Sequence, residues 1–326
     1  MKHIIIMNKD IKIYIAGSTG MVGSACLRIL KSNGYSNIIT SNSSKLDLRD
    51  QKKVNEYISK EKPNIIINAA ALVGGILANS QYPYNFLMDN MLIQNNLIKS
   101  AHENSIEKFI FLGSSCIYPK FSEQPIKESY LLTDSLEPTN QWYAIAKISG
   151  VMLIKSIREQ FGLDYISLMP TNLYGPNDNF DLLASHVLPS MIRKFHEAKL
   201  NNDSTVILWG TGSPMREFLH VDDLAKAVKF AVENTFQEDL YNVGSGMDIS
   251  IKDLANLVQQ IIGHKGKIIW DNSKPDGTPK KLMDSSKLNN LGWKPEIKLE
   301  DGVRSTYTWF LNNKIKSRKV LKNEKK

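Results

Sequence analysis

The stretch Ala16–Gly23 (AGSTGMVG) decides the fold of this 326-residue chain. A short apolar run, 11–16, precedes it, and residues 21–31 repeat their apolar side chains with a helical period. Its glycines follow the spacing G-x-x-G-x-x-G, not G-x-G-x-x-G. Glycines between a strand and a helix permit a tight turn and let the backbone approach a pyrophosphate at the helix N-terminus. The stretch therefore predicts a dinucleotide site at the start of a parallel sheet.

Strand and helix patterns alternate from this stretch to about residue 176. Further strands are expected at 37–40, 65–68, 109–113 and 165–169, and helices at 54–60, 86–104 and 141–161. Such alternation is typical of a parallel sheet with crossover helices. After residue 176 the pattern is irregular, and 217–234 and 241–244 are expected to return to the sheet. We therefore expect an α/β fold, a Rossmann-type doubly wound parallel sheet with a smaller interleaved α/β substrate lobe.

The predicted Rossmann domain spans 11–176 with about 217–245, and the substrate lobe spans about 177–216 and 246–312. The last fourteen residues, 313–326, carry seven Lys or Arg and one Glu. This tail supplies +6 of the net charge of +8, which leaves about +2 for the body (8 − 6). The body therefore has no basic face for a nucleic acid, and we expect a solvated, disordered tail.

Cysteine content and hydropathy favour a cytoplasmic protein with no membrane partner. Cys26 and Cys116 are too few for a disulfide framework, which fits a reducing compartment. The apolar run 4–7 is too short for a signal peptide, and no run approaches the ~20 apolar residues of a membrane span. Translation starts at Met1 or Met7. The six histidines and two cysteines show no metal-ligand spacing, so no metal is expected.

A candidate proton-transfer group lies between the fourth strand and the following helix. Tyr143 and Lys147 are four residues apart and share a helix face, and Ser114 follows the strand. A phenol has a pKa near 10, and a nearby ammonium is expected to lower it. The three side chains can polarise a carbonyl and give it a proton while a nicotinamide delivers hydride. An exposed Tyr–Lys pair without function is the alternative.

The order of these motifs resembles the extended short-chain dehydrogenase/reductase family of sugar-nucleotide enzymes. The resemblance rests on Gly17–Gly23, Asn68-Ala69-Ala70, Gly113-Ser114-Ser115, Tyr143 with Lys147, and Pro170-Thr171-Asn172. Longer strings extend it to members that act on GDP-sugars: Leu112–Pro119, Met169–Pro176, Ser185–Val187, Trp209–Gly210, Pro214–Phe218 and Lys274–Pro279. Together they cover the chain from Ile13 to about Leu311.

This resemblance implies three steps on GDP-4-keto-6-deoxy-D-mannose: inversion at C3, inversion at C5, and NADPH-dependent reduction at C4. The C3 and C5 protons are acidic because both carbons flank the ketone, and the Tyr143 and Ser114 hydroxyls can stabilise the enolate. Inversion needs a base on one face and an acid on the other. The resemblance implies Cys116 as the base and His186 as the acid. By residue type alone, Cys116 is a small buried hydrophobe and His186 a hydrogen-bonded polar residue.

The resemblance also implies the binding residues. Those for NADP(H) are Gly17, Gly20, Met21, Val22, Gly23, Asp47, Ala69, Lys147, Pro170, Asn172, Leu173 and His186. Those for the GDP-sugar are Asn172, Val187, Lys194, Trp209, Arg216, Asp276 and Lys280. Arg216 offers a bidentate fork for phosphate, and Trp209 is either an aromatic contact or a core residue. Helices 86–104 and 141–161 resemble those through which the family forms a homodimer, although packing in a monomer's core is the alternative.

The chain departs from the family at the adenosine end of the cofactor. The family has an arginine in the glycine loop and another after the second strand, both suited to the 2′-phosphate. This chain has Thr19 in the loop and uncharged residues 40–44, with no acid before Asp47. The residues themselves leave the 2′-phosphate question open, so NADH remains possible beside NADPH.

Three alternative functions stay open. One is a related 3,5-epimerase and 4-reductase of another GDP-4-keto sugar, such as a heptose. A second is a simple nucleotide-sugar 4-reductase or UDP-sugar 4-epimerase, which has no need of Cys116 with His186. A third is a redox-sensing or binding protein that has lost the chemistry, against which Ser114, Tyr143 and Lys147 together argue.

Overall fold

The structure is a computed structural model that describes residues 8–182, 185–274 and 276–313. The expectations for the N-terminal run 4–7, for a start at Met7, for Pro275 and for the basic tail after Asn313 lie outside the described residues. Among the described residues, no helix is both long enough and apolar enough to cross a membrane.

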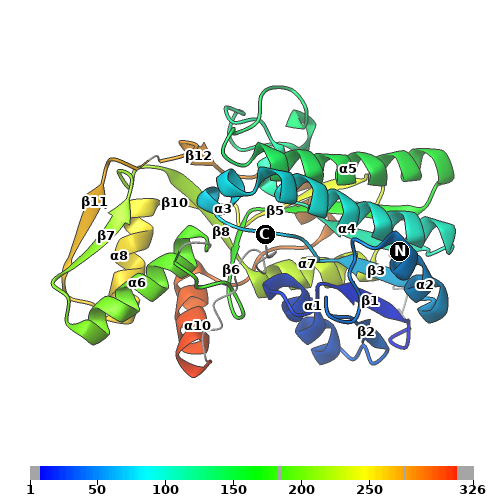
Figure 1. Ribbon diagram of the computed structural model, residues 1–326, viewed down its shortest axis with the longest axis horizontal. Coiled ribbons are helices and arrows are strands. Elements are labelled where there is room, and N and C mark those ends of the chain that lie inside the picture. Colours follow the sequence, from blue (N-terminus) through cyan, green and yellow to red (C-terminus); the bar gives the residue numbers. More distant parts are fainter. Residues whose placement is uncertain (1–7, 183–184, 275, 314–326) are drawn as a thin grey trace, which may run out of the picture.

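A six-stranded parallel sheet forms the centre of the larger lobe (Figure 1), in the order β2-β1-β3-β4-β5-β9. Its strands are β1 (Ile13–Ala16), β2 (Ile38–Thr40), β3 (Ile65–Asn68), β4 (Lys108–Leu112), β5 (Asp164–Pro170) and β9 (Leu240–Val243). The chain first moves outward from β1 to β2 and then crosses to β3 on the other side of β1. Ligands bind outside the carboxyl ends of the strands at such a switch point. The predicted fold class is confirmed.

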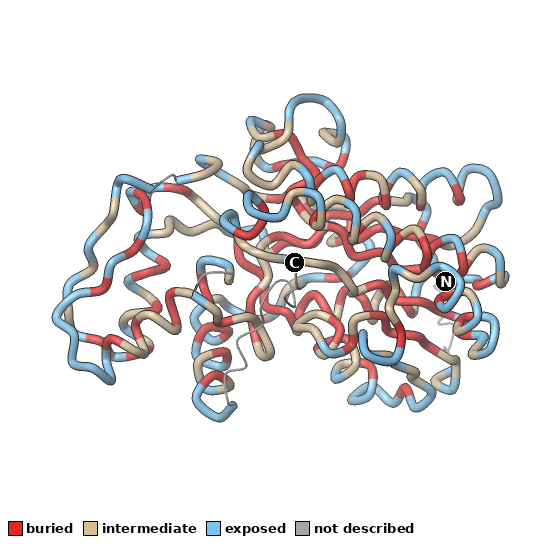
Figure 2. The backbone as a smooth tube through the Cα atoms, in the orientation of Figure 1, coloured by how far each residue is buried: buried red, intermediate tan, exposed pale blue. Residues whose placement is uncertain are grey.

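Helices cover both faces of this sheet because successive strand residues point to opposite sides. Ile13 and Ile15 pack with α1 (Met21–Ser32) and α7 (Val221–Glu233). Tyr14 packs on the other face, against the layer of α2 (Gln51–Glu61), α4 (Pro83–Glu103) and α5 (Gln141–Phe161). Figure 2 shows the sheet buried and the outer helix turns exposed. Burial on both faces explains why the strands are continuous apolar runs.

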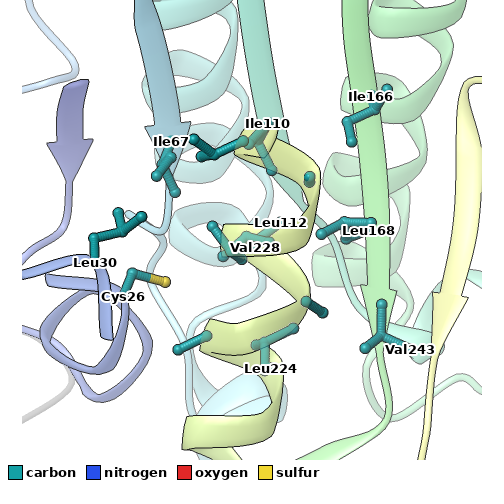
Figure 3. Close-up of a cluster of buried hydrophobic side chains, with 14 of the residues drawn as sticks. Cys26, Leu30, Ile67, Ile110, Leu112, Ile166, Leu168, Leu224, Val228 and Val243 are labelled. Carbon is teal, nitrogen blue, oxygen red and sulfur yellow. The ribbon is translucent and has the colours of Figure 1, made fainter. Parts of the chain in front are cut away.

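Figure 3 shows the first of these two cores, where Leu112 and Leu168 of the sheet face Leu224 and Val228 of α7. All four side chains are buried. Full burial of one such aliphatic side chain contributes roughly 1.5–3 kcal/mol. This packing fixes the carboxyl ends of β4 and β5, where the predicted site residues follow.

The smaller lobe is built around β8 (Met215–His220), which pairs with three short strands, and around a separate two-stranded sheet. The partners of β8 are β6 (Asn172–Tyr174), β10 (Asp248–Ser250) and β12 (Lys280–Lys281), and the second sheet is β7 (Thr205–Trp209) with β11 (Lys267–Asp271). The remaining helices are α3 (Ile76–Gln81), α6 (Val187–Asn201), α8 (Ile251–Ile262), α9 (Ser286–Leu291) and α10 (Leu299–Asn312), with the 3-10 turns η1 (Ser115–Ile117) and η2 (Glu128–Tyr130). A third core packs Phe195 and Phe218 against Leu254.

One segment is placed differently from the sequence prediction. Of the stretch 217–234, only α7 covers the large sheet, because β8 pairs with β6, β10 and β12 instead. The sixth position of the large sheet, beside β5, is taken by β9, which confirms the strand expected at 241–244. The sequence boundaries of the two predicted lobes stay a prediction.

Helix termini follow local capping chemistry. The α2 helix begins at Gln51, earlier than the expected residue 54, because the Asp50 side chain accepts a hydrogen bond of 3.1 Å from Lys53 N. The α4 helix begins at Pro83, also earlier than expected, since proline suits the first helical position. The α5 helix spans 141–161 as predicted.

Candidate active site

The glycine turn between β1 and α1 has no room for side chains. Gly17 has a φ of +79°, and a Cβ there would lie 2.7 Å from the Ala69 backbone. A Cβ on Gly23 would lie 2.2 Å from the Gly17 oxygen. Gly20 caps α1 without a side-chain hydrogen bond, so the N–H groups of the first turn are left for an anion. Met21 and Val22 form the first turn of this helix.

The neighbouring strand ends also fit a dinucleotide. Asn68 ends β3 fully buried, its Oδ1 accepts a hydrogen bond from Ala70 N at 3.1 Å, and its Nδ2 has no hydrogen-bond partner among the described residues. Pro170 ends β5, Asn172 and Leu173 follow in β6, and Asn172 Nδ2 donates to Glu217 O at 2.8 Å. The glycine turn and the free N–H groups at the start of α1 fit a pyrophosphate. The Asn68 amide is a buried donor available to the same ligand.

At the adenosine end, polar groups mostly bind each other. The Tyr14 hydroxyl lies 2.7 Å from Ser41 Oγ, directly after β2. Asp47 accepts hydrogen bonds from Arg49 at 2.9 and 3.0 Å, and the second arm of Arg49 reaches Asp89 at 3.4 Å. Thr19 in the glycine turn is exposed. Within the described parts of the chain, Arg49 is the first arginine after β2, and it is paired with the carboxylates of Asp47 and Asp89.

The predicted proton-transfer group gathers at the carboxyl end of β4. Lys147 Nζ donates to Leu112 O at 2.8 Å, the last residue of that strand. The same Nζ lies 5.8 Å from the centroid of the Tyr143 ring. Ser114 follows as the cap of η1, and its Oγ accepts a hydrogen bond from Cys116 N at 3.3 Å. Lys147 is 3% exposed, so the interpretation as an exposed Tyr–Lys pair is wrong.

Burial controls the protonation of this group. It lowers the pKa of Lys147 to about 8, and it raises the pKa of the Tyr143 hydroxyl, with the nearby Cys116 adding to the rise. The expected lowering of the phenol's pKa by Lys147 is not found, because burial of the Tyr143 hydroxyl dominates. A raised pKa keeps the hydroxyl protonated at neutral pH, which is the form that a proton donor needs.

Cys116 lies among charged and polar groups. Its side chain is buried, and burial raises the pKa of the thiol, while the charge of Lys281, the Ser114 hydrogen bond and the charge of Lys147 lower it. The thiol also acts electrostatically on Tyr143. Neighbours of this kind are unlike those of a thiol that only fills a hydrophobic core.

His186 caps α6 in the smaller lobe. It is exposed to solvent, yet enough protein surrounds it for desolvation to lower the pKa of the imidazole. The ring is therefore neutral at pH 7, and an acid role requires it to take up a proton first. Among the described residues, no hydrogen bond or ion pair joins His186 to Cys116. Val187 follows as the first residue of α6 and is exposed.

An open aromatic face lies at the end of β7. Trp209 is 56% exposed, so its interpretation as a core residue is wrong. Lys194 Nζ and Lys274 Nζ lie 6.0 and 5.7 Å from the centroid of its ring. Lys194 Nζ also donates to Ile207 O at 3.0 Å, which fixes its side chain against β7. Asp276 accepts hydrogen bonds from Thr211 N and Oγ1 at 2.7 and 2.8 Å and anchors the following loop.

The two adjacent lysines of β12 have different surroundings. Lys280 Nζ forms an ion pair with Asp248 Oδ2 at 3.1 Å. Lys281 pairs in register with Arg216 and interacts electrostatically with Arg216, Cys116 and Glu137. The sequence prediction missed Lys281 and Glu137. Strand alternation within the lysine pair was the available signal for Lys281, whereas Glu137, in an irregular loop, gave none.

Among the described residues, no group of three or more His, Cys, Asp or Glu side chains is placed to hold a metal ion. Both cysteines are free and buried.

Fold and strand-end chemistry define a class of nicotinamide-dependent sugar-nucleotide enzymes. The chain belongs to the NAD dependent epimerase/dehydratase family, whose model matches residues 13–244. It is 55% identical over 306 residues to GDP-L-fucose synthase 1 of Arabidopsis thaliana, and the alignment covers 94% of this chain and 95% of that protein. The predicted family is confirmed.

Two solved structures share the whole fold. One is a GDP-6-OMe-4-keto-L-xylo-heptose reductase from C. jejuni, with a TM-score of 0.90, 34% identity, and coverage of 94% of this chain and 99% of that chain. The other is a GDP-L-fucose synthetase from Naegleria fowleri bound to NADP, with a TM-score of 0.87, 29% identity and coverage of 96% of both chains.

Proposed function

We propose that the protein is an oxidoreductase with epimerase activity that converts GDP-4-keto-6-deoxy-D-mannose to GDP-L-fucose. The observation that carries this proposal is the position of Cys116 beside the Tyr143–Lys147 pair. A simple 4-reductase or 4-epimerase uses the Tyr–Lys pair but has no need of a thiol there. The similarity to a plant GDP-L-fucose synthase supports the same conclusion.

In the epimerisation, Cys116 removes a proton from C3 or C5. The electrons of the C–H bond move toward the C4 oxygen, where the Tyr143 and Ser114 hydroxyls stabilise the enolate. Protonation from the opposite face completes the inversion. We assign that step to His186, which must first bind a proton because its imidazole is neutral at pH 7.

In the reduction, the Tyr143 hydroxyl gives its proton to the C4 oxygen. Lys147, whose pKa is about 8, is mostly protonated at pH 7, and its Nζ lies 5.8 Å from the centroid of the Tyr143 ring. When bound, the nicotinamide supplies the hydride. Its dinucleotide would be held by the glycine turn and the orphaned Asn68 amide. NADP(H) is the proposed cofactor, on the similarity to an NADP-bound synthetase.

The GDP moiety is proposed to bind the smaller lobe. Arg216 is partly buried, and desolvation lowers the pKa of its guanidinium, which stays charged and ready for a diphosphate. Trp209 offers its face to the base, with Lys194 beside it. Lys280, by contrast, already has Asp248 as its partner, so its predicted substrate contact has no support from this geometry.

A second candidate substrate is a GDP-4-keto-heptose. The similarity in fold to a C. jejuni reductase of a GDP-4-keto-heptose favours it. A heptose needs room for one more carbon and for the oxygen substituents that a 6-deoxyhexose lacks.

The test follows NADPH absorbance with each GDP-4-keto sugar and determines the product by NMR. We expect rapid oxidation with the 6-deoxyhexose and a product inverted at C3 and C5. A product reduced at C4 with both centres unchanged would leave a simple 4-reductase, and faster turnover of the heptose would establish the second candidate.

We also propose a cytoplasmic homodimer that forms through α4 and α5, which run side by side in Figure 1. Both helices expose large apolar side chains: Tyr84, Met88, Leu92, Trp142, Ile145 and Met152. An apolar face of this kind is typical of a subunit interface. Light scattering at micromolar concentration should report a dimer, and Leu92→Glu should convert it to a monomer. Leu200→Glu, at an exposed leucine of the smaller lobe, is the matched control. A wild-type monomer would contradict the dimer.

A further inference from the structure

Lys281 is a charged side chain that the mechanism above does not use. It stands beside Arg216 because β12 and β8 pair in register, and it interacts electrostatically with Cys116 and Glu137. Within 8–182, 185–274 and 276–313, its ammonium has no hydrogen-bond or ion-pair partner. A half-buried cation without a fixed partner is available to a nearby anion.

Strand alternation separates this lysine from its neighbour. Lys280 and Lys281 are the two residues of β12, and successive strand residues point to opposite faces. The ion pair with Asp248 holds Lys280 on one face. Lys281 therefore points to the other face, and its ammonium interacts electrostatically with the thiol of Cys116.

The backbone around Lys281 is held on both sides. Met215 N of β8 donates to Pro279 O at 2.9 Å, before the lysine. After it, Leu282 N donates to Gln124 Oε1 and Ile126 N donates to Leu282 O, both at 2.7 Å. Residues 124–126 lie in the loop that follows the Cys116 turn. These hydrogen bonds fix the backbone of Lys281 between the smaller lobe and the loop that follows Cys116. A residue that orients another side chain needs such a fixed position.

We propose that Lys281 is the cation that holds Cys116 as a thiolate, the form in which it removes the C3 and C5 protons. This inference rests on the proposed function. A thiolate is the basic form of cysteine, and burial alone disfavours it. Of the groups that oppose burial, Lys281 lowers the pKa of Cys116 most, ahead of Ser114 and Lys147. Tyr143 is the other titratable group that faces the thiol.

Lys281 acts through Cys116 and is therefore a positioning residue. Burial lowers the pKa of Lys281, while the nearby Cys116 and Glu137 raise it. In the proposed step the sulfur accepts the proton from carbon, the C–H electron pair becomes the enolate, and the ammonium keeps its own proton. Glu137 interacts electrostatically with both Lys281 and Arg216, and its carboxylate forms an ion pair with Lys120 at 2.9 Å. In this proposal, the two neighbouring cations have different anions: Lys281 interacts with the thiolate, and Arg216 binds the sugar diphosphate.

The test measures the rate at which iodoacetamide alkylates Cys116 as a function of pH, with the modified peptide identified by mass spectrometry. Only the thiolate reacts, and Cys26 is an internal control because it is fully buried with a pKa of about 12. Lys281→Met should move the profile up by about one pH unit or more, as loss of one neighbouring cation does. At pH 7.5 the rate should fall about tenfold.

Three further variants guard against a change in folding. Lys281→Gln must behave like Lys281→Met, and Lys281→Arg, which keeps the charge, must restore the wild-type profile. Lys280→Met removes the same charge one residue away and should leave the profile unmoved. A wild-type profile in Lys281→Met, or equal shifts in the Met variants of both lysines, would overturn the proposal.

The alkylation profile needs no sugar, so its result is independent of the proposed function. A wild-type enzyme that makes no GDP-L-fucose would contradict the function and leave the Lys281–Cys116 interaction standing. With the sugar, Lys281→Met should slow C3 and C5 proton exchange about tenfold at pH 7.5 and recover at higher pH, whereas a merely structural loss would not recover.

Discussion

The two ends of the predicted cofactor site differ in packing. At the sugar end, Lys147 and Cys116 are 3% and 7% exposed, and their neighbours fix their positions. At the adenosine end, Thr19 and residues 42–45 are exposed. The sugar end has each residue that the family resemblance implies for the reaction, while the adenosine end has Thr19 and the uncharged residues 40–44 where the resemblance implies arginines.

This contrast shows where the protein's function is constrained by packing. A proton transfer needs its groups at fixed distances, so these groups lie on the ends of buried strands and helices. Recognition of a 2′-phosphate uses long side chains at the surface, which can change without disturbing the core. The effects predicted below are therefore large at the sugar end and small at the adenosine end.

The largest effect is expected from Tyr143→Phe. The change removes only the hydroxyl that donates to the C4 oxygen, and general acid catalysis of this kind contributes ~10²–10⁴-fold. Turnover should fall by that factor, while NADPH affinity, measured by fluorescence, stays within a few-fold of wild type. Retention of most activity would exclude Tyr143 as the donor.

The next effect concerns the stability cost of burying Lys147. Its folded pKa of about 8 lies below the ordinary value of 10.5, so between these values the unfolded chain binds more protons. Stability due to this group therefore rises with pH across that window. Lys147→Met should raise the free energy of unfolding above that of wild type, and this advantage should be largest below pH 8. The advantage should shrink by on the order of 3 kcal/mol toward pH 10.5. Urea unfolding of both proteins measures it, and a difference that does not change with pH would contradict the buried charge.

The sequence predicted the local features of the site well and its long-range features poorly. The glycine spacing and the Tyr143–Lys147 spacing are local patterns, and helix periodicity placed α5 correctly. The role of β8 could not be predicted, because its three pairings join segments far apart in the chain. The same holds for Lys281, whose position beside Cys116 depends on strand register, and for Tyr143, whose raised pKa depends on how deeply the ring is buried.

A smaller effect is expected in cofactor choice. Because Arg49, the first arginine after β2 among the described residues, is paired with carboxylates, NADPH should be preferred over NADH by less than a thousandfold in kcat/KM. Thr19→Arg should raise the preference by about ten- to a hundredfold, since a hydrogen bond to a charged group contributes ~1.5–3 kcal/mol. A stronger preference in wild type that Lys45→Met abolishes would show that this lysine binds the phosphate.

The central claim is that Cys116 begins an epimerisation that precedes reduction. The most direct measurement is deuterium exchange at C3 and C5 of GDP-4-keto-6-deoxy-D-mannose in D₂O, with NADP⁺ bound so that reduction cannot follow. Wild type and Cys26→Ala should exchange both positions, and Cys116→Ser should exchange neither, because a serine hydroxyl is a far weaker base than a thiolate. His186→Asn should still exchange but invert slowly. A Cys116→Ser enzyme that exchanges and inverts like wild type would contradict the account.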